Sequence, residues 1–138
     1  MERKLQFRAW KIKEKEMLPA HEIGAIDFFG GRMLRDTEIF FFDEDRYGDK
    51  VDLHLMQFTG LKDKNGKEIY EGDFLKDEYD RILLVEWWQY AFTLKAITKT
   101  NFVRANYIIQ WFIGVPFLPE IIGNIYENPE LLEPKIEE

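Results

Sequence analysis

The sequence predicts an all-β or nearly all-β fold: a small, partly open β-barrel or a pair of packed β-meanders with a short C-terminal helix. Short β-prone runs recur along the chain at the spacing of small barrels and sandwiches. Asn65-Gly66 separates two arms of alternating apolar residues, which is the strongest short-range hairpin signal. The 138 residues are 46% hydrophobic and 16% aromatic, which suffices for a buried core. We therefore expect residues 1–138 to form a single β-rich domain.

The first third of the chain is expected to hold several short strands. Residues 7–10 are typical of a strand, and a second strand returns at residues 17–19 after a charged turn. Residues 20–36 contain three glycines and have no clean period, so we expect loop with one short strand around residues 25–29. Residues 37–42 form a compact β-prone run that an acidic turn closes.

The middle of the chain carries the clearest strand signals. Val51, Leu53 and Leu55 alternate with polar residues, which predicts a strand with one apolar face. Asn65-Gly66 then predicts a type I′ turn in which both residues adopt positive φ. A second tight turn is expected at Glu71-Gly72-Asp73, and residues 81–88 and 90–97 should pair as a meander.

The last third contains one ambiguous segment and one clear ending. Residues 102–113 could form an amphipathic helix or a buried strand, and Pro116 stops either. Residues 120–126 are typical of a last strand. Asn128-Pro129 then supplies an N-cap and a proline at the first helical position, which predicts the short C-terminal helix.

Composition excludes several classes of function. Cysteine and serine are both absent, which excludes disulfides, thiolate metal sites and every mechanism with a Ser or Cys nucleophile. The net charge of −7 weighs against generic duplex binding. Residues 1–15 nevertheless carry six basic side chains against two acidic ones. This basic arm either attracts the acidic C-terminal end or contacts an anion or nucleic acid locally.

The chain shows no sign of membrane insertion or export. It has no run of eighteen apolar residues, so we expect no transmembrane helix. Its N-terminal charges are not followed by an apolar stretch, so we expect no secretory signal and a cytoplasmic location.

Three blocks of the sequence resemble the YopX family of bacteriophage and prophage proteins. They are Phe7-Arg8-Ala9-Trp10, residues 56–76 around Asn65-Gly66, and residues 122–132, which begin Ile122-Gly123-Asn124. The resemblance implies a β-rich protein that phages and prophages encode and that acts inside the host bacterium. It implies no catalytic residues, and the biochemical function of the family is unassigned.

Eight residues are candidates for contacting a partner. Six belong to the two predicted turns, where polar groups accumulate on a rigid scaffold; in the alternative interpretation their glycines serve the backbone and their charges only face solvent. The other two are adjacent tryptophans, which face opposite ways on a strand, so a loop, a second subunit or a stacked base could cover one of them. The candidates are Thr59, Lys62, Asp63, Asn65, Tyr70, Asp73, Trp87 and Trp88.

The sequence predicts no metal and no cofactor. His21 and His54 are the only histidines, and their spacing predicts no zinc site. Calcium-loop alignments on Gly48 or Gly66 lack essential carboxylates. Asp73 is the carboxylate to test for acid–base or metal-assisted chemistry, although we expect it to bind neighbouring backbone N–H groups and fix its turn.

The function predicted from these observations is a non-enzymatic phage accessory protein. It would work by protein–protein contact in the host cytoplasm, either as a homo-oligomer or bound to a host protein. The alternative is a nucleic-acid-binding barrel that uses the basic N-terminal arm and exposed aromatic residues. A carboxylate-based enzyme is the third hypothesis.

Overall fold

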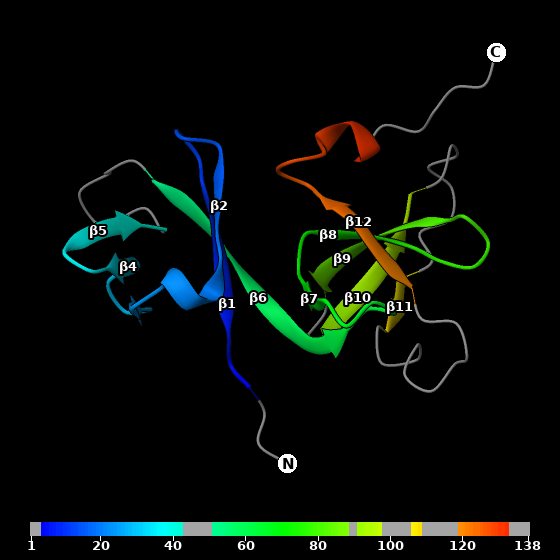
Figure 1. The fold of residues 1–138 in the computed structure, drawn as a ribbon, viewed down its shortest axis with the longest axis horizontal. Helices are drawn as coiled ribbons and strands as arrows, with labels where there is room; N and C mark the ends of the chain where they lie inside the picture. The colour runs from blue at the N-terminus through cyan, green and yellow to red at the C-terminus, as the bar shows by residue number, and fades with distance from the viewer. Residues whose placement is uncertain (1–3, 43–50, 89–90, 98–105, 109–118, 133–138) are drawn as a thin grey trace. The chain divides into compact units, whose positions relative to one another are not determined.

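The computed structural model describes residues 4–42, 51–88, 91–97, 106–108 and 119–132. These ranges contain β-strands and short 3-10 helices and no α-helix (Figure 1). The strands form three antiparallel sheets, one of them a half-barrel. The all-β prediction is thus confirmed, and the expected C-terminal helix is the 3-10 helix η3 (Pro129–Leu132).

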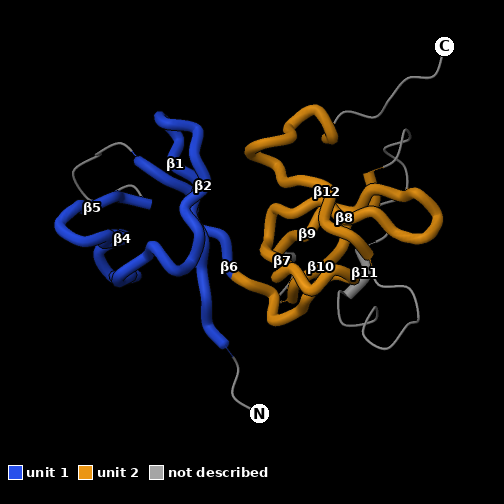
Figure 2. The backbone as a smooth tube through the Cα atoms, viewed as in Figure 1, with its two compact units in different colours: residues 1–57 blue, residues 58–138 orange. Residues whose placement is uncertain are grey.

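The chain divides into two compact units, residues 1–57 and residues 58–138 (Figure 2). Strand β6 (Leu53–Lys62) belongs to both, because its first half pairs with β1 (Phe7–Lys11) and its second half with β7 (Glu68–Tyr70). The expectation of one domain over residues 1–138 stays a prediction.

The first unit consists of two sheets that share a core. One contains β1 and β2 beside the first half of β6, and the other has the strand order β3-β4-β5. Ala9, Leu18 and Leu53 from the first sheet meet Met33 from the second, and all four are fully buried. Burial of each large apolar side chain contributes about 1.5–3 kcal/mol. The elements are β1 (Phe7–Lys11), β2 (Glu16–Leu18), η1 (Ala20–Glu22), β3 (Ala25–Asp27), β4 (Arg32–Arg35) and β5 (Glu38–Phe41).

Strand β4 corrects the prediction of loop over residues 20–36. The expected short strand around residues 25–29 is present as β3, but the sequence did not reveal its partner. A four-residue strand is too short for alternation to emerge from the pattern. Its side chain Met33 is nonetheless fully buried, and Asp36 adopts φ +52°, which permits the tight turn into β5.

The second unit is built on a five-stranded sheet with the order β11-β10-β9-β8-β12. The last strand therefore returns to the far side of β8, the first strand of the meander. The predicted meander of residues 81–88 and 90–97 is confirmed as β9 and β10. The strands of the second unit beside the second half of β6 are β7 (Glu68–Tyr70), β8 (Asp73–Lys76), β9 (Ile82–Trp88), β10 (Ala91–Ala96), β11 (Asn106–Ile108) and β12 (Glu120–Asn124).

Strand β11 falls within the segment that the sequence left open between helix and strand. Residues 106–108 form a strand against β10, and the remainder of residues 102–113 lies outside the described residues. The core of this unit comes from β7, β8, β9 and β10, and its buried members are Ile69, Leu75, Leu83, Val85, Phe92 and Leu94.

Candidate functional site

Asp63 is the central residue of the turn between β6 and β7. Its side chain is buried, with 3% of the residue exposed. One carboxylate oxygen accepts the N–H groups of Asn65 and Lys67, each at 2.9 Å, and the other accepts the N–H of Ile121 at 3.0 Å. Burial acts to raise the pKa of Asp63, but these three N–H groups and the charge of Lys67 outweigh it and lower the pKa. The carboxylate is therefore committed to holding the backbone.

The turn itself is not the predicted type I′ turn. Gly66 adopts φ +80°, but Asn65 is not among the residues with positive φ. Gly66 N–H donates to the carbonyl of Asp63 at 3.0 Å, and Asp63 N–H donates to the carbonyl of Lys67 at 2.8 Å. The prediction is wrong because the Asp63 side chain supplies acceptors for the backbone and so stabilises a longer loop than a two-residue turn.

The same turn is attached to the start of β12. Lys64 N–H donates to the carbonyl of Pro119 at 3.1 Å. The side chain of Glu120 accepts from Asn65 Nδ2 at 3.3 Å and lies 3.2 Å from Lys64 Nζ. The polar residues of the turn, Asp63 included, thus join the β6–β7 hairpin to a strand far along the sequence.

Thr59 supports an irregularity in the β6–β7 pairing. The register shifts between Phe58 and Lys62, and Gly60 adopts φ +90° there. The Thr59 hydroxyl donates to the carbonyl of Ile69 at 2.8 Å and accepts from the N–H of Leu61 at 3.2 Å. Thr59 therefore satisfies backbone groups that a bulged strand leaves without ladder partners, whereas Lys62 is exposed.

Tyr70 and Asp73 bracket the second predicted turn, which is confirmed between β7 and β8. Gly72 adopts φ +88°, and the buried carboxylate of Asp73 accepts the N–H of Tyr70 at 2.8 Å. The ring of Tyr70 lies 5.6 Å from that of Phe58. Asp73 thus binds a neighbouring backbone N–H, as the sequence led us to expect.

The two tryptophans lie at the end of β9, away in sequence from the turns. Trp87 is 55% exposed and meets Phe92 edge to face, with ring centroids 4.9 Å apart and planes at 76°. Trp88 is paired with Ala91 in the β9–β10 ladder, but its side chain lies outside the described part of the structure. Of the eight candidates, the structure thus connects Asp63 with Asn65 and Tyr70 with Asp73 through hydrogen bonds.

The basic N-terminal arm is largely the β1–β2 hairpin. Lys11 Nζ lies 3.7 Å from the carboxylate of Glu16 and 5.5 Å from the ring centre of Phe40. One of the basic charges proposed for nucleic-acid contact is therefore engaged within the first unit.

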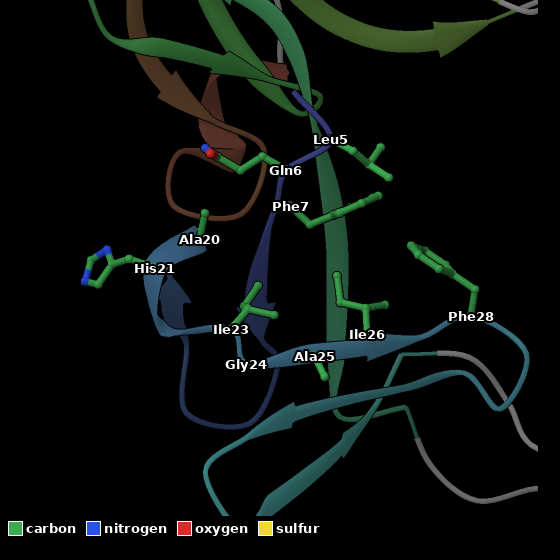
Figure 3. A pocket seen from close by; sticks show the side chains of 10 residues that line it. All are labelled: Leu5, Gln6, Phe7, Ala20, His21, Ile23, Gly24, Ala25, Ile26 and Phe28. Atoms are coloured by element: carbon green, nitrogen blue, oxygen red, sulfur yellow. The ribbon is translucent and has the colours of Figure 1, made fainter. Parts of the chain in front are cut away.

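An apolar groove in the first unit was not anticipated from the sequence. It encloses about 420 Å³ beside β3 and η1. In Figure 3 the side chains of Phe7, Ile26 and Phe28 border the opening, whereas His21 points away from it. No Lys, Arg, Asp or Glu is among the described residues that line it. The residues of the apolar groove are Leu5, Gln6, Phe7, Ala20, His21, Ile23, Gly24, Ala25, Ile26 and Phe28.

Two large apolar side chains of the groove remain exposed. Leu5 is 69% exposed and Phe28 is 58% exposed. The Phe28 ring nevertheless has a defined place, with its centre 5.3 Å from that of Phe7 and 6.0 Å from that of Phe42. The neighbouring Phe29 is 99% exposed and does not line the groove.

Sequence reasoning missed the groove because three separate segments build it. The stretch before β1, the η1 turn and β3 each contribute a few residues, and no periodicity connects them. The one available signal was Phe28-Phe29, two adjacent aromatic residues directly before Gly30-Gly31, at the end of the one short strand expected in a segment otherwise interpreted as loop. Large apolar residues in a loop are informative because loops otherwise expose polar groups.

The described residues hold neither a cluster of three metal-binding side chains nor a helix with the length and apolar character to cross a bilayer.

Comparison with known proteins places the chain in a family. The family model described as YopX protein matches residues 6–133. The chain is also similar to the crystal structure of protein EF1440 from Enterococcus faecalis, with a TM-score of 0.64 and 29% sequence identity over 96% of this chain and 100% of that one. No curated protein matches it. Because the family model spans nearly the whole sequence, from the β1–β2 hairpin to the η3 turn, this chain belongs to the YopX family.

Proposed function

We propose that this protein is a non-enzymatic protein–protein interaction module that uses the apolar groove of its first unit as a contact surface. The observation that carries the proposal is the exposure of Leu5 and Phe28 at the rim of an uncharged cavity. Burying such side chains against a partner removes apolar surface from water, and contiguous exposed apolar residues are typical of interaction sites.

The state of the buried carboxylates supports a role without catalysis. Asp63 and Asp73 both accept backbone N–H groups, and a general acid or base must instead reach a substrate proton. The sequence resemblance to phage and prophage proteins adds the setting: a protein acting in the cytoplasm of a bacterial host.

Charge favours a protein partner over nucleic acid at this groove. Nucleic-acid affinity depends on neutralising phosphates with Lys or Arg, and within the part of the chain that the structure describes neither residue type lines the groove. The chain as a whole carries a net charge of −7. A surface that is mostly apolar, with no Lys, Arg, Asp or Glu among its described residues, fits an apolar protein surface better.

The test is a capture experiment with three versions of the full chain. Wild type, Phe28→Ala and Phe29→Ala are each immobilised and exposed to bacterial lysate, and their native masses are measured in parallel. We expect one stoichiometric protein, retained by wild type and Phe29→Ala and lost with Phe28→Ala. Phe29 is the matched control because it is also an exposed phenylalanine but lies outside the groove.

Two results would overturn the proposal. One is retention of nucleic acid that decreases steeply with salt and involves no protein. The other is a partner retained equally by all three versions, since the groove would then not be the contact surface. Circular dichroism of Phe28→Ala establishes that the loss of binding does not reflect unfolding.

A further inference from the structure

We propose that the apolar groove binds an extended segment of a partner protein, which pairs with the free edge of β3 and inserts a large apolar side chain beside Phe7, Ile26 and Phe28. The inference rests on the proposed function and specifies the binding mode and the chemistry of the partner. Strand addition of this kind takes its affinity from backbone hydrogen bonds and its specificity from pockets for alternate side chains.

Strand β3 is an edge strand, and it pairs on one side with β4. Residues of an antiparallel strand direct their N–H and C=O groups alternately to one neighbour and the other. Phe42 N–H donates to the carbonyl of Gly31 at 2.9 Å, so Gly31 and, two residues on, Met33 face β5. Leu34 must then face β3, and its carbonyl indeed accepts the N–H of Gly24 at 2.8 Å.

One residue of β3, Ile26, directs its backbone N–H and C=O groups toward the edge of the sheet. Ala25 pairs with Leu34 and Asp27 with Arg32, so these two direct their backbone groups toward β4. Ile26, between them, must direct its N–H and C=O away from β4. Within the described part of the chain, neither group of Ile26 has a backbone partner outside the β3–β4 pair.

The edge of β3 lies at the apolar groove. Ala25 and Ile26 both line the groove although their side chains point to opposite faces of the sheet, so the groove follows the edge of β3. Ile26 is half-buried, and its side chain lies on the same face of the sheet as that of its partner Met33. Figure 3 shows the Ile26 side chain beside the opening, with Phe7 and Phe28 around it. A strand laid along β3 would alternate its side chains. Every second side chain would therefore enter the apolar cavity while the others face outward.

We identify the occupant as a short segment of another protein. Ten of the described residues line the groove, whereas a stable interface between two globular proteins uses about 20–30 residues a side. The area thus suits a peptide-sized segment better than a second copy of this chain. Because no Lys, Arg, Asp or Glu is among the described residues around the groove, the inserted side chain should be uncharged: leucine, isoleucine, phenylalanine or tryptophan.

The experiment uses the full chain labelled with ¹⁵N and synthetic peptides of about eight residues. Each peptide alternates threonine with one apolar residue type, and a control peptide has aspartate at the apolar positions. We expect the apolar peptides to bind, to slow hydrogen exchange of the Ile26 N–H, and to bind Phe28→Ala about tenfold more weakly, while Phe29→Ala binds like wild type.

Backbone pairing is tested separately from apolar contact by methylating peptide nitrogens. Successive N–H groups of a strand point to opposite sides. One peptide is methylated at its odd residues and another at its even residues, with side chains unchanged. If the peptide pairs with β3, only one of the two sets removes donors from the shared edge, so only that peptide should lose binding.

Several results would overturn the inference. One is the absence of peptide binding at about 1 mM peptide. Others are equal effects of the two methylation patterns on binding, and unchanged hydrogen exchange of the Ile26 N–H in a saturated complex. The last is a dimer that Phe28→Ala dissociates, because the occupant of the groove would then be a second copy of this chain.

The two proposals can fail separately. If no peptide binds but Phe28→Ala still abolishes capture of a protein from lysate, strand addition is ruled out and the interaction module is retained.

Discussion

At the scale of single residues, Asp63 illustrates how backbone N–H groups stabilise a buried charge. Its two oxygens accept the backbone N–H groups of Asn65 and Lys67, which follow it in the turn, and of Ile121 in β12. Hydrogen bonds to a charged group are worth about 1.5–3 kcal/mol, and an N–H left buried without an acceptor is costly. Much of the local stability of the second unit should therefore depend on this carboxylate.

We predict that Asp63→Asn lowers the free energy of unfolding by about 1–3 kcal/mol at neutral pH. The amide has one acceptor oxygen, so its NH₂ group must face a backbone donor that the carboxylate accepted. Urea denaturation measures the loss. Asp36→Asn is the matched control, because Asp36 is exposed and asparagine tolerates its positive φ; an equal loss in both variants would contradict the prediction.

The contribution of Asp63 should also depend on pH. Since folding lowers the pKa of Asp63, its stabilisation is fully present above the unfolded value of about 4 and is lost as the pH falls through the lower folded pKa. The difference between wild type and Asp63→Asn should therefore shrink as the pH decreases below about 4. A difference that stays constant in an acid titration of stability would contradict this.

Gly66 provides a second prediction for a single residue. A Cβ at this position would meet no atom within 4 Å, so substitution is penalised only through its φ of +80°. We expect Gly66→Ala to cost about 1–2 kcal/mol and Gly66→Asn clearly less, because asparagine adopts this conformation more readily. Equal costs in chemical denaturation would show that space rather than backbone conformation limits the position.

At the scale of elements, the end of β12 is closed by two asparagines that bind the backbone near each other. The side-chain oxygen of Asn124 accepts the N–H groups of Tyr126 and Glu127 at 3.0 and 2.9 Å. That of Asn128 accepts the N–H of Asn124 at 3.2 Å. Asn128 was expected to cap the following helix, but its side chain accepts this hydrogen bond from the strand. The same amide lies against Gly123, where an added Cβ would overlap it.

We predict that Gly123→Ala destabilises the protein by about 1–3 kcal/mol, because the new methyl group displaces the Asn128 side chain. Asn128→Ala should also destabilise, through loss of the hydrogen bond to Asn124. The double variant should lose less than the sum of the two, since the second substitution removes the atoms that the methyl group meets. A double-mutant cycle by urea denaturation tests this, and simple additivity would contradict it.

The elements also show what could be predicted from this sequence. Strands with a strong local signal were foreseen, such as β6 with its alternating apolar residues and β9 with its continuous β-prone run. Strand β4 was not foreseen, because its one fully buried side chain, Met33, packs against Leu18 and Leu53 from another sheet, and this contact leaves no local pattern in the sequence. The type I′ prediction failed for a related reason. The Asp63 carboxylate that stabilises the longer loop also accepts the N–H of Ile121, and no local pattern near residue 65 reveals that contact.

At the scale of the whole molecule, charge limits the choice of partner. The excess of acidic groups gives a net charge of −7, which repels the phosphate backbone at a distance. We predict no binding of a duplex of about 20 base pairs at about 0.15 M salt. Fluorescence anisotropy measures this, and affinity that decreases steeply with added salt would favour the basic N-terminal arm as a nucleic-acid contact.

The hydrogen bond from Ile121 to Asp63 has a consequence for how the protein is made. A ribosome releases the chain from its N-terminus, so every strand of the first unit leaves it before the second unit is complete. The carboxylate at position 63, in contrast, obtains its third N–H only when residue 121 has emerged, and β8 obtains β12 at the same time. We therefore expect the two halves of the nascent chain to gain resistance to proteases in sequence, the second only after residue 121 has left the ribosome.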